Sequence, residues 1–306
     1  METTDQGGVK SVALVLTGAA LFGTAGTAAA FAPEGASPAA LGTLRLLVGA
    51  VVLIALVPLL GGSWRRLPGL VRRPAIWVMA VTSAAYQPLF FGAVDRSGVA
   101  LSTLITVGAA PIFSGLLGRA VLKQALTRAW MTATTIAIVG LVLRSWGSLD
   151  LSDALGVLMA LAAGFALATY VVAAKGELDR GAHAVELPGM AYLLGSIFLI
   201  PILLTQPMAW VATASGLAVV VYLGVVTMSL ANVSAIVGLR GMPPGPASTL
   251  LLADPLTATI LGLVVLGESI SWIGGLGLVL VLIGLVLQAQ AVGRTKRDEP
   301  DPAPVM

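Results

Sequence analysis

The sequence predicts an all-α integral membrane protein whose ten transmembrane helices form two inverted repeats of five. First, the chain of 306 residues is 58% hydrophobic and 10% charged, with a mean hydropathy of +0.98, whereas soluble domains carry about 25% charged residues. Second, ten apolar stretches are long enough to cross a hydrocarbon layer of about 30 Å. Third, short sequence matches recur about 144 positions apart.

The spans follow one another with short polar connections. Residues 187–239 carry no charge and would extend roughly 80 Å as one helix, so the proline-containing turn at 205–207 is expected to divide them. The first span exceeds the apolar core of about 7 to 15 residues that is typical of a signal peptide, which is the alternative interpretation. The ten predicted spans are 11–33, 37–60, 75–94, 99–120, 129–146, 154–174, 186–204, 212–238, 246–267 and 271–290.

The basic residues are distributed unevenly between the connections. If the amino terminus is cytoplasmic, 14 of the 17 Lys and Arg residues fall on the cytoplasmic side, Arg96 and Arg144 fall outside, and Arg45 lies within the second span. Positive charge is retained on the inner side of membranes. We therefore expect a multi-pass protein of a bacterial plasma membrane with both termini in the cytoplasm.

The two predicted repeats face opposite ways, because five crossings force the second copy to enter from the other side. Pro111 and Pro255 stand 144 positions apart, and the tetrapeptide Gly-Leu-Val-Leu occurs at 140–143 and at 284–287. The expected organisation is a cytoplasmic tail (1–10), a first repeat (11–147), a second repeat (148–291) and a disordered cytoplasmic tail (292–306).

The ninth span contains an acid and a proline side by side. A carboxylate at the bilayer centre costs about 2.5–3.5 kcal/mol, so Asp254 should face a polar cavity or a partner. Pro255 lacks a backbone donor and should leave a carbonyl one turn earlier free to bind something. Three interpretations of Asp254 stay open: a structural ion pair with Arg45, a proton or cation site, and exposure to an aqueous vestibule.

Further polar and helix-breaking residues occur within the spans. Amides and a phenol offer hydrogen bonds at mid-depth, although Gln87 and Asn232 could join helices, Tyr86 could pack, and the prolines could only shape helices. By contrast, the predicted cytoplasmic loop containing Glu177, Asp179 and His183 reads as ordinary, and Glu268 as a solvated helix end. The candidate substrate-binding residues are Tyr86, Gln87, Pro111, Asn232, Asp254 and Pro255, with Asp254 and Arg45 as the coupling site or ion pair.

Several classes of chemistry lack their residues. The chain has no cysteine and one histidine, His183, and contains no H-E-x-x-H, nucleophile-elbow or phosphate-loop motif. We therefore expect no catalytic residue, metal or cofactor. The basic residues lie between apolar spans, which argues against a nucleic-acid partner. The expected partners are a small-molecule substrate and membrane lipids. A passive channel and a membrane-embedded enzyme remain as alternatives of other classes.

Motifs in both halves resemble the drug/metabolite transporter superfamily, and within it the ten-helix EamA-type transporters. They are Thr43-Leu44-Arg45 in the second span, Gly98-Val99-Ala100 through Pro111 in the fourth, and Pro255 followed by Leu266-Gly267-Glu268 in the ninth. The resemblance covers about residues 12–290. A local likeness to threonine and homoserine exporters lies at 168–172. Gln124 departs from the pattern, because many members have a glutamate there.

This resemblance implies a central substrate cavity lined by the third, fourth, eighth and ninth helices, with alternating access by rocking of the two halves. The expected function is that of a secondary active transporter of small polar metabolites, an exporter of amino acids or related compounds, with proton coupling through Asp254 as a hypothesis. A multidrug or cation exporter of the same fold is the alternative.

Overall fold

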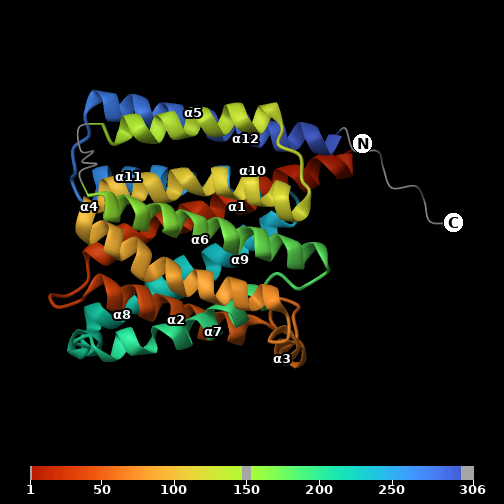
Figure 1. Ribbon diagram of the computed structural model, residues 1–306. Coiled ribbons are helices and arrows are strands. Elements are labelled where there is room, and N and C mark those ends of the chain that lie inside the picture. The colour runs from red at the N-terminus through yellow and green to blue at the C-terminus, as the bar shows by residue number, and fades with distance from the viewer. Residues whose placement is uncertain (1, 147–152, 298–306) are drawn as a thin grey trace.

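The computed structural model of this protein describes residues 2–146 and 153–297, which form a single bundle of helices (Figure 1). No strand occurs among these residues. The helices are α1 (Glu2–Ala30), α2 (Pro38–Leu56), η1 (Trp64–Arg66), α3 (Leu67–Leu70), α4 (Pro74–Leu122), α5 (Arg128–Arg144), α6 (Ala154–Asp179), α7 (Glu186–Leu204), η2 (Ala209–Ala212), α8 (Ala214–Tyr222), η3 (Leu223–Leu230), α9 (Ala231–Leu239), α10 (Pro244–Leu250), α11 (Ala253–Val265) and α12 (Trp272–Arg297).

Eight helical segments within the described residues are long and apolar enough to cross a membrane. One of them, α4, has 49 residues and would extend roughly 74 Å if straight, more than twice the hydrocarbon thickness. Its helical geometry is interrupted at Gly98, whose φ of 76° and ψ of 162° suit a residue without a Cβ. Helix α5 has 17 residues and Arg at both ends, and it is not among these eight segments.

The eighth and ninth predicted spans each change geometry along their length. The first consists of α8, the π-helical segment η3 and α9 in direct succession. The second consists of α10 and α11, which meet at a turn just before Asp254. The carbonyl that Pro255 was expected to leave free belongs to Leu251, and it accepts the backbone N–H of Asp254 at 3.0 Å. That expectation is wrong, because Pro255 lies in the first turn of a new helix, where its missing N–H has no intrahelical partner to lose.

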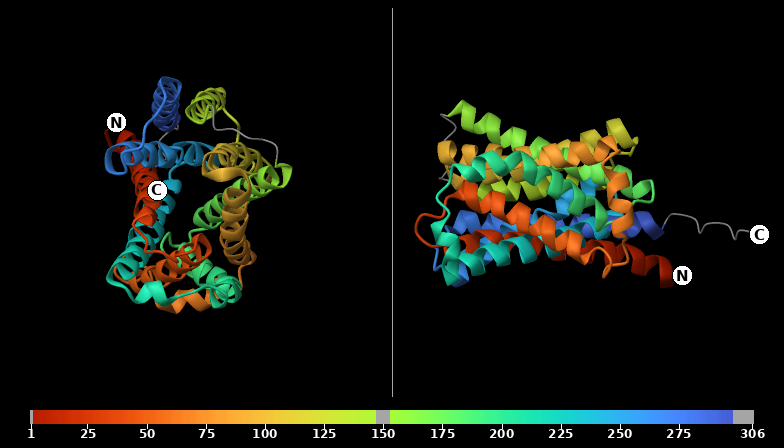
Figure 2. Two further views of the ribbon diagram at one scale, coloured as in Figure 1. Left: turned by 90° about the vertical axis from the view of Figure 1, so that its left-hand side faces the viewer. Right: turned by 90° about the horizontal axis from the view of Figure 1, so that it is seen from below.

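Helices from the first half of the chain pack against helices from the second half. Helix α6 packs along α4, whereas α1 packs against α9 and α11; α2 contacts α7, and α5 contacts α12. Viewed along the helices, α5 and α12 lie side by side at one edge of the bundle (Figure 2). Gly23 permits a close approach of α1 to α11, because a Cβ there would collide with the backbone of Asp254.

The first and last helices extend into the residues predicted as tails. Helix α1 begins at Glu2, and α12 continues to Arg297, so both predicted tails are at least partly helical. Residues 298–306 and the predicted boundary between the repeats at 147/148 lie outside the described residues. The start of α1 and the end of α12 lie at the same end of the bundle, which we call the terminal end (Figure 1). The predicted break at 205–207 is confirmed, because α7 ends at Leu204.

Candidate functional site

A cation in the second helix faces an amide in the fourth. Arg45, on α2, donates through Nη2 to Oε1 of Gln87 on α4 at 3.4 Å. Gln87 is 4% exposed, and its Oε1 lies so close to Gly42 that a Cβ there would collide with it. The Nε of Arg45 is buried and has no hydrogen-bond partner. The guanidinium is therefore only partly satisfied within the bundle, which is a costly state for a cation.

The acid of the ninth helix lies near this cation without pairing with it. Asp254 lies in the first turn of α11, and its side chain is partly exposed. Arg45 lies within electrostatic range of Asp254 and of Tyr86, but no nitrogen of Arg45 lies within 4.0 Å of a carboxylate oxygen of Asp254 among the described ion pairs. A direct structural ion pair, one of the three interpretations of Asp254, is therefore not formed in this conformation.

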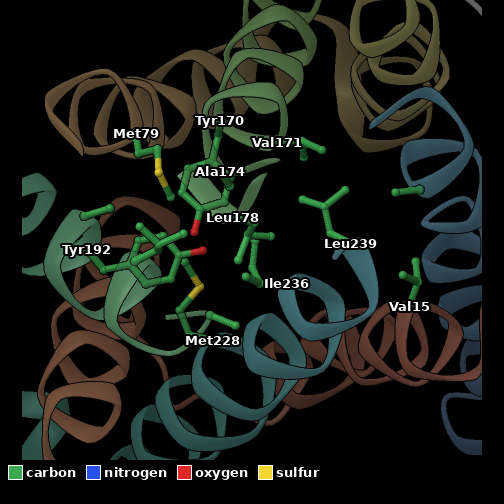
Figure 3. Close-up of a cluster of buried hydrophobic side chains, with 14 of the residues drawn as sticks. Val15, Met79, Tyr170, Val171, Ala174, Leu178, Tyr192, Met228, Ile236 and Leu239 are labelled. Carbon is green, nitrogen blue, oxygen red and sulfur yellow. The ribbon is translucent and has the colours of Figure 1, made fainter. Parts of the chain in front are cut away.

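Two tyrosines that were not among the sequence candidates extend the polar group. Tyr192 on α7 donates to Oδ1 of Asn232 on α9 at 2.5 Å, and the amide of Asn232 donates to the carbonyl of Met228 at 2.9 Å. The ring of Tyr170 stacks on that of Tyr192 with centroids 5.7 Å apart, and their hydroxyl groups point toward each other (Figure 3). The only feature of the sequence that could have indicated a role for these two residues is that all four tyrosines of the chain lie within predicted spans.

The π-helical segment η3 helps to place Asn232. The hydroxyl of Ser229 donates to the carbonyl of Gly224, five residues back, at 2.9 Å and to that of Gly49 on α2 at 3.1 Å. The segment η3 ends directly before α9, whose second residue is Asn232. Single turns of π-helix are frequent at functional sites because they rotate the residues that follow.

The structure does not join all the sequence candidates. Arg45 contacts Gln87, and Asn232 contacts Tyr192, while Arg45 also lies within electrostatic range of Tyr192. Tyr86 stacks on Phe90 at 5.6 Å, which agrees with a packing role. Pro111 is buried in the second half of α4, and no described hydrogen bond connects it to this group. Pro255 is buried beside Asp254, and its carbonyl accepts Thr259.

A second cluster of charges lies at the terminal end. Glu177 belongs to this cluster, so the prediction that it lies in an ordinary cytoplasmic loop is wrong. This residue belongs to α6 and its side chain is 3% exposed. It accepts from Arg73, the residue before α4, at 2.6 Å and from Arg180 at 2.8 Å. Sequence position alone suggested solvent, because the predicted span ends at residue 174 and Glu177 follows it. The chain folds back over it instead.

Neighbouring groups extend this terminal network. The carboxylate of Glu186, also 3% exposed, accepts the backbone N–H of Ser63 at 2.8 Å and lies 3.8 Å from Arg66. On α6, Lys175 donates to the carbonyl of Arg240 at 3.0 Å and pairs with Asp179 at 2.8 Å. These contacts bind α6 and α7 to the connection before α4 and to the end of α9.

The arrangement defines a class of protein: a multi-pass helical membrane protein with polar and charged side chains inside the bundle. Within the described ranges, no group of three or more His, Asp or Glu residues could hold a metal ion. The profile of the EamA-like transporter family matches residues 9–146 and again residues 154–289. The chain belongs to the EamA-like transporter family.

Individual relatives agree with this assignment. The chain is 36% identical over 294 residues to the uncharacterized transporter YwfM of Bacillus subtilis, covering 93% of this chain and 95% of that protein. It is 28% identical over 286 residues to an uncharacterized transporter of Archaeoglobus fulgidus, covering 91% and 99%. A protein of known crystal structure superposes with a TM-score of 0.78 at 20% identity, covering 93% of this chain and 98% of that one. This last likeness concerns the fold.

Proposed function

We propose that this transporter is a secondary carrier that exports amino acids or related zwitterions. The observation that supports the proposal is the pair of opposite charges, Arg45 and Asp254, which lie within electrostatic range of each other but are not joined. Each charge is expensive in a membrane interior. A zwitterion placed between them would offer its carboxylate to Arg45 and its ammonium to Asp254, and would lower the cost of both.

Hydrogen-bonding groups next to the charges fit the same substrate class. Gln87 already contacts Arg45, Tyr192 lies within electrostatic range of Arg45, and Tyr170 stacks on Tyr192. Such groups can orient a small polar molecule, because each has a defined donor or acceptor direction. Tyr170 also belongs to the segment that resembles threonine and homoserine exporters.

The carrier mechanism rests on two inverted repeats of five crossings, with α4 counted as two helices divided at Gly98 and with α5 included. Two residues 144 positions apart, Lys123 and Gly267, both have positive φ, 56° and 67°. In each case the following residue donates its backbone N–H to a glycine carbonyl six positions earlier, namely Gln124 to Gly118 and Glu268 to Gly262. The two matches to one family profile and the packing between the two halves support the same repeats.

Alternating access would follow from rocking of these halves. The terminal end carries most of the basic residues, so we assign it to the cytoplasm of a bacterium. There Glu177 and Arg73 join the second half to the first. In this conformation the network would close the cytoplasmic end, and transport would require that it opens.

Competition between related solutes tests the substrate class. In proteoliposomes, neutral amino acids should compete for uptake of a labelled amino acid better than the corresponding amines or carboxylic acids. Arg45→Gln should raise the half-saturating concentration at least about tenfold, because a hydrogen bond between charged groups is lost. If amines compete as well as amino acids, and Arg45→Gln leaves them unaffected, the cation-exporter alternative is correct.

The proton-coupling hypothesis has a separate test. Asp254→Asn should abolish the dependence of transport on an imposed pH gradient while exchange of labelled substrate persists, because the side chain can no longer carry a proton. Asp95→Asn, which changes an exposed aspartate of the same chain, is the matched control. Unchanged gradient dependence in folded Asp254→Asn protein would rule out this coupling site, whatever the substrate proves to be.

A further inference from the structure

A cavity at the terminal end lies apart from the site described above. It has a volume of about 170 Å³ and lies where α5 and α12 meet the second half of α4 and the start of α10. One water occupies roughly 30 Å³ of the liquid, so the cavity holds more than a single bridging water. Its lining includes the segment 124–127, together with Ser114, Trp130 and Gln288.

Two amide oxygens in this cavity have no partner. Gln288 is 1% exposed, and both its Oε1 and the Oε1 of Gln124 are buried without a hydrogen bond. The indole N–H of Trp130 is already donated to Thr249 at 3.2 Å, and Ser114 is bonded to Ser248 at 2.7 Å. A buried acceptor without a donor costs about 1–3 kcal/mol. A guest that brings N–H or O–H donors would satisfy both oxygens.

The corresponding corner at the opposite end shows what is missing here. Gln124 stands 144 positions before Glu268, and Gln288 stands 144 positions after Arg144. Arg144 interacts electrostatically with Glu268 and donates to Thr259. The corner at the opposite end thus has an acid and a base of the chain within electrostatic range of each other, whereas the corner at the terminal end has two neutral amides and a cavity.

Charge outside the cavity indicates how a guest would be oriented. The lining segment 124–127 is flanked by Lys123 and Arg128, both exposed. A simple cation would be repelled by these groups, and a simple anion would leave the two unpartnered amide oxygens unsatisfied. We propose that this cavity binds the ammonium group of a zwitterion, with the anionic group directed toward Lys123 and Arg128. The proposal does not depend on the proposed transport function.

The same chemistry occurs in the head group of an ethanolamine phospholipid and in free phosphoethanolamine. The full-length protein in phosphatidylcholine nanodiscs should show a raised Tm when phosphatidylethanolamine is included, or when phosphoethanolamine is added. A shift with the lipid alone identifies a lipid site, and a shift with the soluble compound identifies a site open to the cytoplasm. If neither compound shifts the Tm, the cavity holds water and the proposal is overturned.

Variants at one position separate binding from folding. Gln288→Leu should weaken binding about tenfold through the lost hydrogen bond to a charged group, with an unchanged or higher Tm without ligand. Gln288→Glu should tighten binding by a similar factor. Gln290→Leu, on the exposed face of the same helix, is the control and should bind as the wild type does. Equal binding by the Gln288→Leu variant and the wild-type protein, or weaker binding after Gln288→Glu, would refute the site.

Discussion

The two ends of the bundle are held together in different ways. At the terminal end, the carboxylates of Glu177 and Glu186 are each 3% exposed and are bound by arginine or by backbone N–H groups. At the opposite end, Arg96 pairs with Asp153 at 3.0 Å, but these side chains are 45% and 28% exposed. A carboxylate that is buried and hydrogen-bonded loses much of its stabilisation when a partner is removed, whereas a pair whose two side chains both reach solvent is screened by water and salt.

The difference is not a property of the proposed repeats. The position 144 residues before Glu177 is Pro33, and the position 144 residues after Arg73 is Leu217. The network at the terminal end therefore has no copy at the other end, although the backbone geometry at Lys123 and Gly267 is repeated. We infer that the two halves share a scaffold and that closure of one end has been added to it by individual side chains.

The largest expected effect is at Glu177. Because the chain has no cysteine, Ala184→Cys, at a buried position of the terminal end, can report on opening through its reaction with a water-soluble maleimide. Glu177→Gln should increase the reaction rate roughly tenfold or more, since two charge-assisted hydrogen bonds are lost. Ala154→Cys, exposed at the start of α6, should react equally in both backgrounds. An unchanged rate at Ala184→Cys would show that this network does not close the end.

A smaller effect is expected at Glu186, where different substitutions remove the interaction with Arg66 and the hydrogen bond from Ser63. Glu186→Gln keeps an oxygen that accepts the N–H of Ser63 and loses only the attraction to Arg66 at 3.8 Å, so labelling should rise by a few-fold at most. Glu186→Leu leaves that N–H unpaired and should destabilise the closed end by about 1–3 kcal/mol. The comparison is measured by labelling and thermal unfolding. Equal effects of the two substitutions would mean that the hydrogen bond to Ser63 contributes little.

The smallest effect is expected at the opposite end. Arg96→Gln should leave transport and labelling within experimental error, because its pair with Asp153 is exposed. The backbone N–H of Gly156, followed by the Arg96 side chain, lowers the pKa of the Asp153 carboxyl below its usual value. The stabilisation of the folded protein by the Asp153 carboxylate is therefore complete above the usual pKa of Asp, about 3.9. It is lost only as pH falls through the lowered pKa. A change in thermal stability of this end between pH 5 and 8 that Asp153→Asn removes would contradict this assignment.

Sequence reasoning succeeded where a single residue type determines the local outcome. The break after Leu204 followed from a proline-containing turn, and membrane insertion followed from composition. It failed where the outcome depended on which segment folds over another. Glu177 lies near a helix end, a position that usually meets solvent, and only the approach of Arg73 and the following loop buries it. Tyr192 gave no sequence signal that could distinguish it from an interfacial aromatic residue.

The amino-acid sequence by itself determined that this chain enters a membrane as helices, that the long uncharged stretch 187–239 is divided after Leu204, and that Arg45 and Asp254 are costly residues in their spans. These properties depend on local hydropathy and on backbone donors, which are fixed residue by residue. Only the tertiary structure decided that Arg45 meets Gln87 without pairing with Asp254, and that a buried carboxylate at one end is paired with Arg73. Those outcomes depend on the rotation and contact of helices far apart in the chain, which no local pattern specifies.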